Sequence, residues 1–273
     1  MSSRNHGFTL IELLVAVALA LIVLFAASNL LISSSSSATN LQARNDMAQE
    51  GQIALNYIAA NVREAAYVYP NGTTLNLGGG DTTRRPGGGS WVVGNTNAPI
   101  LAFIKAPKDV PPSDPCVHPV TGALDNEDAC YKFVAYYPVL RSYWVNHISA
   151  ESQNYPGADP ANGDRWLLVE YRRNILANTL PTMANLGILN VASGSGKILL
   201  DYVQPAVPNL QPLFTVQADS PQTPGNVRVT MNFSMNRLAS GKEVTIPARP
   251  SPDPATWTQT LSAAPRNIGT LAP

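Results

Sequence analysis

The chain has 273 residues, a length of one or two domains, and its apolar residues (45%) are numerous enough for a sizeable core. Charged residues make up only 13%, which is low for a soluble domain. The 18 basic and 18 acidic residues cancel, so bulk charge gives no indication of nucleic-acid binding. The 23 prolines and 19 glycines lie mostly after Tyr69 and favour turns and short strands over a helical bundle.

The first predicted element is an apolar segment, Leu13–Ile32, in which only Ser28 and Asn29 are polar. As a helix, its twenty residues would extend about 30 Å, the thickness of the hydrocarbon core of a bilayer. Arg4 precedes the segment, so the positive-inside rule places the N-terminus in the cytoplasm. The sequence therefore predicts one transmembrane helix, with the rest of the chain on the far side.

An ordinary secretory signal peptide is the alternative, with the small residues of Phe25–Ser28 as its cleavage site. Two features argue against it, because the apolar run continues through Leu30–Ile32 and because an acid, Glu12, lies near its start. An unpaired carboxylate within a membrane costs about 2.5–3.5 kcal/mol or more, so Glu12 is a candidate functional residue. The simpler interpretation is that its carboxylate reaches the headgroups from the cytoplasmic end of the segment.

The stretch Gly7–Glu12, which reads GFTLIE, resembles the processing motif of type IV prepilins and of type II secretion pseudopilins. The resemblance includes the short polar leader Met1–Gly7 and the apolar helix that follows. It implies that a prepilin peptidase cleaves after Gly7, that Phe8 is then N-methylated, and that the helix stays on the mature protein. Glu12 is the fifth residue after the cut and matches the glutamate that, in this family, meets the N-terminal amine of a neighbouring subunit.

Such a pairing has a physical reason. An α-amino group titrates near pH 8 and N-methylation keeps it basic, so the amine of Phe8 is mostly cationic at neutral pH. In a medium of low dielectric constant, an unpaired charge is much more costly than a paired one. We therefore expect Glu12 to set the register of each subunit in a filament.

The helix is predicted to continue beyond the membrane. The serine-rich stretch Ser33–Asn40 would read as a linker by itself, but serine is only a moderate helix breaker and helix-forming sequence resumes at Leu41. We assign residues 8–69 to one helix of roughly 90 Å, with residues 8–32 as its transmembrane and assembly part. A stripe of apolar residues recurs at helical spacing: Leu55, Ile58, Ala59, Val62, Ala65 and Ala66. We expect this stripe to pack under the chain's own sheet rather than against a partner.

Residues 70–273 are predicted to form a β-rich head. The candidate strands are Ala98–Ile104, Tyr131–Tyr137, Arg165–Tyr171, Lys197–Val203 and Val227–Met235. In the last of these, apolar and polar residues alternate strictly, which is typical of an antiparallel sheet with one buried and one wet face. No strand–helix–strand rhythm indicates a parallel nucleotide-binding sheet. The predicted fold class is α+β, a long N-terminal helix packed on an antiparallel sheet.

The head resembles, more loosely, the large minor pilins of the PilW type and the J pseudopilin of type II secretion. The segments that carry this resemblance occur in the family's order: Ile53–Ala65, Ile198–Phe214, Val227–Met235 and Arg266–Ile268.

The two cysteines, Cys116 and Cys130, have thirteen residues between them. In an exported chain this pair indicates a disulfide that closes a loop, worth roughly 3 kcal/mol. Two free thiols are the alternative. Zinc is disfavoured because His118, the nearest further ligand, has no second histidine at useful spacing.

Three other motifs give weaker signals. Leu77–Ser90 is a predicted loop, in which Arg84 and Arg85 either contact a phosphate or a partner or are simply solvated. Ser193–Ile198 lacks the first glycine and the final Ser or Thr of a phosphate-binding loop and indicates a turn before a strand. Asp125–Asp128 lacks the spacing of an EF-hand calcium loop and reads as an acidic turn.

No catalytic arrangement stands out. Of the three histidines, His6 belongs to the leader, and His118 and His147 lie near turns. There is no nucleophile elbow and no paired-histidine zinc helix. We therefore expect neither an enzyme nor a cofactor or metal.

The sequence as a whole predicts a minor pilin, a structural subunit that initiates or decorates a type IV pilus. The implied partners are the prepilin peptidase, other major and minor pilins, and an inner-membrane assembly platform. The implied location is the inner membrane, crossed once with the head outside the cytoplasm, and then the filament. The alternatives are a type II secretion pseudopilin at the pseudopilus tip, a subunit of a DNA-uptake pilus whose basic residues bind DNA, and an anchored binding module unrelated to filaments.

Overall fold

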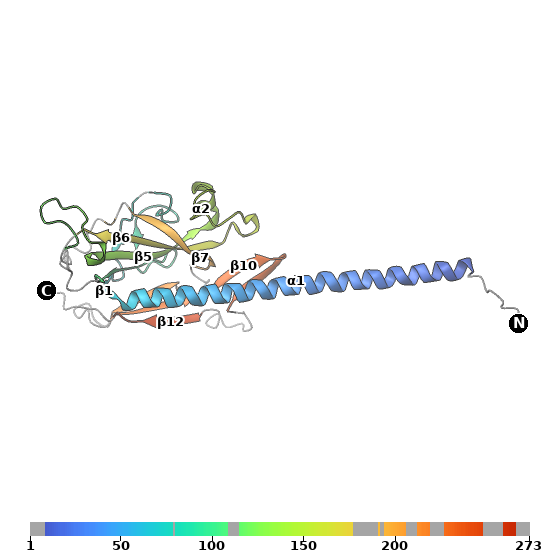
Figure 1. Ribbon diagram of the computed structural model, residues 1–273. Helices are drawn as coiled ribbons and strands as arrows, with labels where there is room; N and C mark the ends of the chain where they lie inside the picture. Colours follow the sequence, from blue (N-terminus) through green and yellow to red (C-terminus); the bar gives the residue numbers. More distant parts are fainter. Residues whose placement is uncertain are drawn as a thin grey trace.

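A long helix leads into a β-rich head in the computed structural model, and its N-terminal half extends away from the head (Figure 1). The structure describes residues 9–78, 80–108, 115–176, 191, 194–205, 212–218, 227–247 and 259–265. The helices are α1 (Leu10–Arg63), α2 (Arg141–His147) and the short 3₁₀ turns η1 (Glu127–Ala129) and η2 (Pro160–Asn162). The strands are β1 (Ala65–Val68), β2 (Thr74–Leu75), β3 (Trp91–Val92), β4 (Leu101–Lys105), β5 (Tyr131–Leu140), β6 (Trp166–Ile175), β7 (Ser195–Val203), β8 (Phe214–Ala218), β9 (Val227–Phe233), β10 (Met235–Ala239), β11 (Lys242–Ile246) and β12 (Gln259–Ala263). The predicted α+β class is confirmed.

The helix α1 is continuous over 54 residues, which corresponds to about 80 Å. It passes through Ser33–Ser37 without interruption. Hydroxyl groups along it donate to carbonyl oxygens one turn back, as Ser28 does to Leu24 at 2.8 Å and Thr39 does to Ser35 at 3.0 Å. These side chains satisfy their hydrogen bonds within the helix, so they do not end it.

The helix ends at Arg63, six residues before the predicted end at residue 69. The segment Ala65–Val68 forms β1 instead and pairs antiparallel with β4. Its last two residues, Tyr67 and Val68, are aromatic and β-branched and fit a strand. An unbroken apolar run such as this one matches helix and strand templates alike, so sheet pairing decided the outcome.

The head contains two principal sheets, and every described strand pair within them is antiparallel, as predicted. The larger sheet has the order β1-β4-β5-β6-β7-β10-β11, and the smaller has the order β12-β9-β8. Strands β2 and β3 form a separate pair. The predicted strand Val227–Met235 is divided at Ser234, so that β9 belongs to the smaller sheet and β10 to the larger one.

The alternation within β9 is only partly the predicted one. Its apolar residues are buried, but Asn232, on the predicted wet face, is buried as well. The Asn232 amide donates to the carbonyl of Pro212 at 2.9 Å, and the Ser234 hydroxyl donates to Gln204 at 3.1 Å. These hydrogen bonds satisfy the buried polar groups at the point where the chain crosses between sheets.

The C-terminal half of α1 lies between the two sheets and contacts strands of both (Figure 1). Its buried apolar residues are Ala43, Met47, Ala54, Leu55, Ile58, Ala59 and Val62. The predicted stripe from Leu55 onward therefore packs under the chain's own sheets. A Cβ atom at Gly51 would lie 2.6 Å from Cε1 of Phe233, so the glycine permits the close approach of helix and sheet.

Candidate assembly site

The start of α1 is closed by a capping box between Thr9 and Glu12. The Thr9 hydroxyl oxygen accepts a hydrogen bond from the Glu12 backbone N–H at 3.3 Å. In return, Oε2 of Glu12 accepts from the backbone N–H and from the hydroxyl of Thr9, both at 3.0 Å. A cap of this kind stabilises a helix by about 1 kcal/mol, and the carboxylate also lies at the positive end of the helix dipole.

Sequence reasoning missed this role of Glu12. The signal was present, because Thr9-Leu10-Ile11-Glu12 has the Thr-x-x-Glu spacing of a capping box. The structure gives the glutamate a local partner in its own chain. Among the described residues, Oε2 carries both hydrogen bonds of this carboxylate and Oε1 carries none.

The first part of the helix that follows packs against no apolar partner among the described residues. Every residue from 10 to 35 is exposed, and the large apolar side chains between Leu10 and Ile32 are 51–80% exposed. Within the described part of the chain, α1 is the helix that is long and apolar enough to cross a membrane. An apolar surface on all sides of a helix requires surroundings that are apolar in every direction.

The two predicted processing residues, Gly7 and Phe8, lie outside the described residues. The structure therefore places only Glu12 among the three residues of the predicted assembly motif. It lies one turn inside the helix, directly after the N-cap residue Thr9 and the first two helical residues.

Residues 2–28 match the family model described as the prokaryotic N-terminal methylation motif. The match supports a type IV pilin-like or pseudopilin protein. No curated protein and no solved structure matches the chain. The motif family is structural rather than enzymatic, and the motif implies processing by a prepilin peptidase and assembly with other pilins. Together with the exposed apolar helix, it fits a membrane-anchored pilin.

A buried polar cluster fixes the end of α1 to the large sheet of this pilin-like chain. Asn61 is buried, and its amide donates to the Tyr136 hydroxyl on β5 at 3.0 Å. The Asn61 oxygen accepts from Nζ of Lys105 on β4 at 2.7 Å, and the same amine pairs with Glu64 at 2.6 Å. Each polar group that the helix buries here is hydrogen-bonded, so the cluster specifies one position of the helix on the sheet.

A second group of side chains lies next to it, at the edge of the helix–sheet contact. The Tyr57 hydroxyl donates to the Glu170 carboxylate at 3.2 Å and accepts from Arg172, which pairs with Glu170 at 2.6 Å. Burial, reinforced by the charge of Glu170, raises the pKa of Tyr57 and of Tyr136. Both phenols therefore remain neutral donors over the physiological pH range.

The predicted disulfide is present, because Cys116 and Cys130 are bonded to each other. The loop that they close packs Val117 and Ala129 against the bridge in a small apolar cluster apart from the main core. Within the loop, Nδ1 of His118 accepts the backbone N–H of Val120 at 3.2 Å.

The acidic segment Asp125–Asp128 is bound by lysines. Asp128 pairs with Lys108 at 3.6 Å and with Lys132 at 3.8 Å. The amine of Lys132 also contacts Glu127 at 3.2 Å and lowers the pKa of that carboxyl. The charges of Glu127 and Asp128 are thus compensated by cations of the same chain.

Proposed function

We propose that this chain is a minor pilin, a structural subunit that initiates or decorates a type IV pilus after processing by a prepilin peptidase. The observation that carries the proposal is an apolar half-helix that no other described part of the chain covers. It begins within a matched methylation motif that has an acid at the fifth position after the proposed cut. Lipid tails surround this half-helix in the bilayer, and the helices of neighbouring subunits surround it in the filament.

The proposed role of Glu12 follows from its geometry. Cleavage after Gly7 leaves a cationic amine on Phe8, and the neighbour's amine approaches a carboxylate that its own helix already holds in place through Thr9. Oε2 is engaged by Thr9, so Oε1 is the oxygen available to the incoming amine. A paired charge is far less costly than an isolated one in an apolar surrounding, which makes the pairing a register device.

The minor-pilin assignment rests on the resemblance of the head to subunits of the PilW type. Under this proposal, the helix spans the inner membrane and the head lies outside the cytoplasm. The inner-membrane assembly platform then moves the subunit into the fibre. The large head then lies on the filament surface, where a rare subunit initiates or decorates the fibre.

The type II secretion pseudopilin is the second candidate, because it shares the same N-terminal signal. The genes beside this one separate the two: a secretin and secretion ATPase set with defects in exoprotein release favours the pseudopilin, and twitching or transformation genes favour the pilus.

The first experiment is the N-terminal mass of the protein isolated from its native membrane. The proposal expects a chain that begins with N-methylated Phe8. A chain that begins at Met1, or after Ala27, would leave Glu12 without a partner amine and would replace the pilin model with an anchored or secreted β-rich domain.

A further inference from the structure

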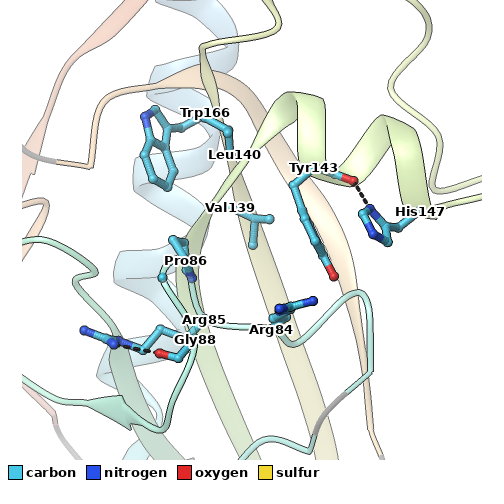
Figure 2. A pocket seen from close by; sticks show the side chains of 10 residues that line it. Arg84, Arg85, Pro86, Gly88, Val139, Leu140, Tyr143, His147 and Trp166 are labelled. Carbon is cyan, nitrogen blue, oxygen red and sulfur yellow. Dashed lines mark hydrogen bonds between the residues drawn. The ribbon is translucent and has the colours of Figure 1, made fainter.

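A groove of about 490 Å³ lies on the head beside α2, away from the helix that would enter a filament. Its walls come from the loop that carries Arg84 and Arg85, from the end of β5, from α2 and from Trp166 at the start of β6. Figure 2 shows Trp166, Val139 and Pro86 on one side of it and Arg84 below Tyr143 and His147 on the other. Trp166, Val139 and Pro86 form an apolar wall, Arg84 lies with the rings of Tyr143 and His147, and Arg85 lies below Pro86 next to Gly88.

The cationic side is organised around the Tyr143 ring. The His147 imidazole stacks on this ring with 4.0 Å between centroids, and its Nδ1 donates to the Tyr143 carbonyl at 2.8 Å. The Arg84 guanidinium lies 5.6 Å from the centroid of the same ring. These contacts hold the aromatic side chains and the cation together at the mouth of the groove.

The arginine loop is fixed to the core before any ligand arrives. The Trp91 indole N–H donates to the carbonyl of Thr83 at 2.9 Å, and the buried Tyr137 hydroxyl donates to that of Thr82 at 2.8 Å. The Thr82 hydroxyl in turn accepts the backbone N–H of Gly196 at 3.0 Å. The two arginines are thus presented by a loop that is anchored through Thr82 and Thr83, while the Arg84 side chain itself is exposed to solvent.

The two arginines of this loop form no ion pair within the described part of the chain. No carboxylate there forms an ion pair with Arg84 or Arg85. The Asp81 carboxylate, in the same loop, accepts a hydrogen bond from the Tyr143 hydroxyl at 3.3 Å. Arg85 donates to the carbonyl of Gly88 at 2.8 Å, and its buried Nε finds no partner among the described residues. A carbonyl satisfies a hydrogen bond but leaves the guanidinium charge uncompensated.

We propose that this groove binds a small ligand in which an oxyanion, carboxylate or phosphate, is joined to an aromatic ring. The planar guanidinium of Arg84 matches the geometry of either oxyanion. The half-buried Trp166 and the neighbouring Val139 and Pro86 offer an apolar wall for the ring, and the volume suffices for a ligand of this size. This proposal does not depend on filament assembly, and its test is independent of the proposed function.

The test is calorimetric titration of the full chain in detergent with two probes, phenyl phosphate and phenylacetate. Inorganic phosphate and benzyl alcohol serve as controls that each carry half of the ligand. At least one probe is expected to bind about tenfold or more tighter than either control, and its affinity is expected to fall as salt is added. The stronger of the two probes identifies the source of the oxyanion.

A matched pair of variants locates the site. Arg84→Gln is expected to weaken the better probe by about tenfold or more, because a charged hydrogen bond is lost. Arg44→Gln removes another exposed arginine, on α1 and outside the groove, and should leave the affinity within about twofold. A second groove variant, Tyr143→Leu, is expected to weaken the same probe.

The proposal is overturned if benzyl alcohol or inorganic phosphate binds as tightly as the better of the two probes. It is also overturned if Arg84→Gln and Arg44→Gln have equal effects.

Discussion

The two halves of α1 share one uninterrupted backbone and yet meet different surroundings. The membrane half, Leu10–Ile32, exposes its apolar side chains on every side, whereas the docked half, Ala43–Val62, buries one face between two sheets. A single apolar stripe needs one partner, which the chain itself supplies. An apolar surface all round needs partners in every direction, which one chain does not supply. The comparison shows that the docked half finds its apolar partners in its own head, whereas the membrane half must find them outside the described part of the chain.

The largest expected effect concerns the membrane half, and it is the loss of filament incorporation in the Glu12→Gln variant. Glutamine keeps the length and the hydrogen-bonding oxygen of the capping box but removes the charge. An uncompensated buried charge costs about 3–5 kcal/mol, so incorporation into filaments should fall by about 100-fold or more, while cleavage and N-methylation continue. The measurement is the ratio of the subunit in sheared filaments to the subunit in membranes. Normal incorporation would show that the charge is not the register device.

The next effect concerns the docked half and uses two isoleucines of the same helix. Ile58 is 1% exposed and Ile53 is 61% exposed. Ile58→Ala should lower the free energy of unfolding by about 2–5 kcal/mol, because it leaves a cavity against the sheets. Ile53→Ala should change it by no more than about 0.5 kcal/mol. Denaturant unfolding of the full chain in detergent, followed by tryptophan fluorescence, gives both values, and equal values would mean that the helix does not dock as described.

A smaller effect is expected where helix and sheet approach most closely. Gly51→Ala would place a methyl group 2.6 Å from the buried Phe233 ring, an overpacking that costs about 1–3 kcal/mol. Alanine also favours the helix by up to about 1 kcal/mol, so the expected net loss of stability is up to about 2 kcal/mol. Glu50→Ala, one residue earlier on the exposed side, is the control and should be nearly neutral. A Gly51→Ala variant more stable than the parent would show that the contact relaxes without cost.

The smallest effect lies at the junction between the halves, in Ser33–Thr39. Ser35→Ala should stabilise the helix there by about 0.5 kcal/mol, because alanine is the better helix former and Ser35 is exposed. Amide hydrogen exchange across the junction should slow by about twofold. If these amides exchange at the rates of an unstructured chain, the two halves are not one rod in solution.

Sequence periodicity predicted the long helix, the buried stripe at its end and the antiparallel sheet. These features have a local cause, because side-chain spacing alone decides which face of a helix or strand is apolar. The end of the helix was not predictable in this way, because Ala65–Val68 fit either element until β4 pairs with them. The burial of Asn232 was missed for the same reason, since its partner, Pro212, is twenty residues away.

The same distinction between local and long-range causes applies to the candidate sites. The motif at Gly7–Glu12 is a short linear signal and could be read directly from the sequence. The capping role of Glu12 could also have been predicted from the sequence, since its partner is three residues away. The groove at Arg84 was not, because it is formed by a loop, a helix and two strands that only folding brings together.

The covalent link between α1 and the head has a mechanical consequence. A single residue, Glu64, separates the last residue of the helix from β1, an edge strand of the larger sheet. Tension along the rod reaches the head both through this link and through the whole buried face of the docked half. The buried contacts and the Asn61 cluster share that load in shear and must slide together rather than detach one after another. The head is therefore attached to α1 along the whole docked half of the helix and not only through the peptide link at its C-terminal end.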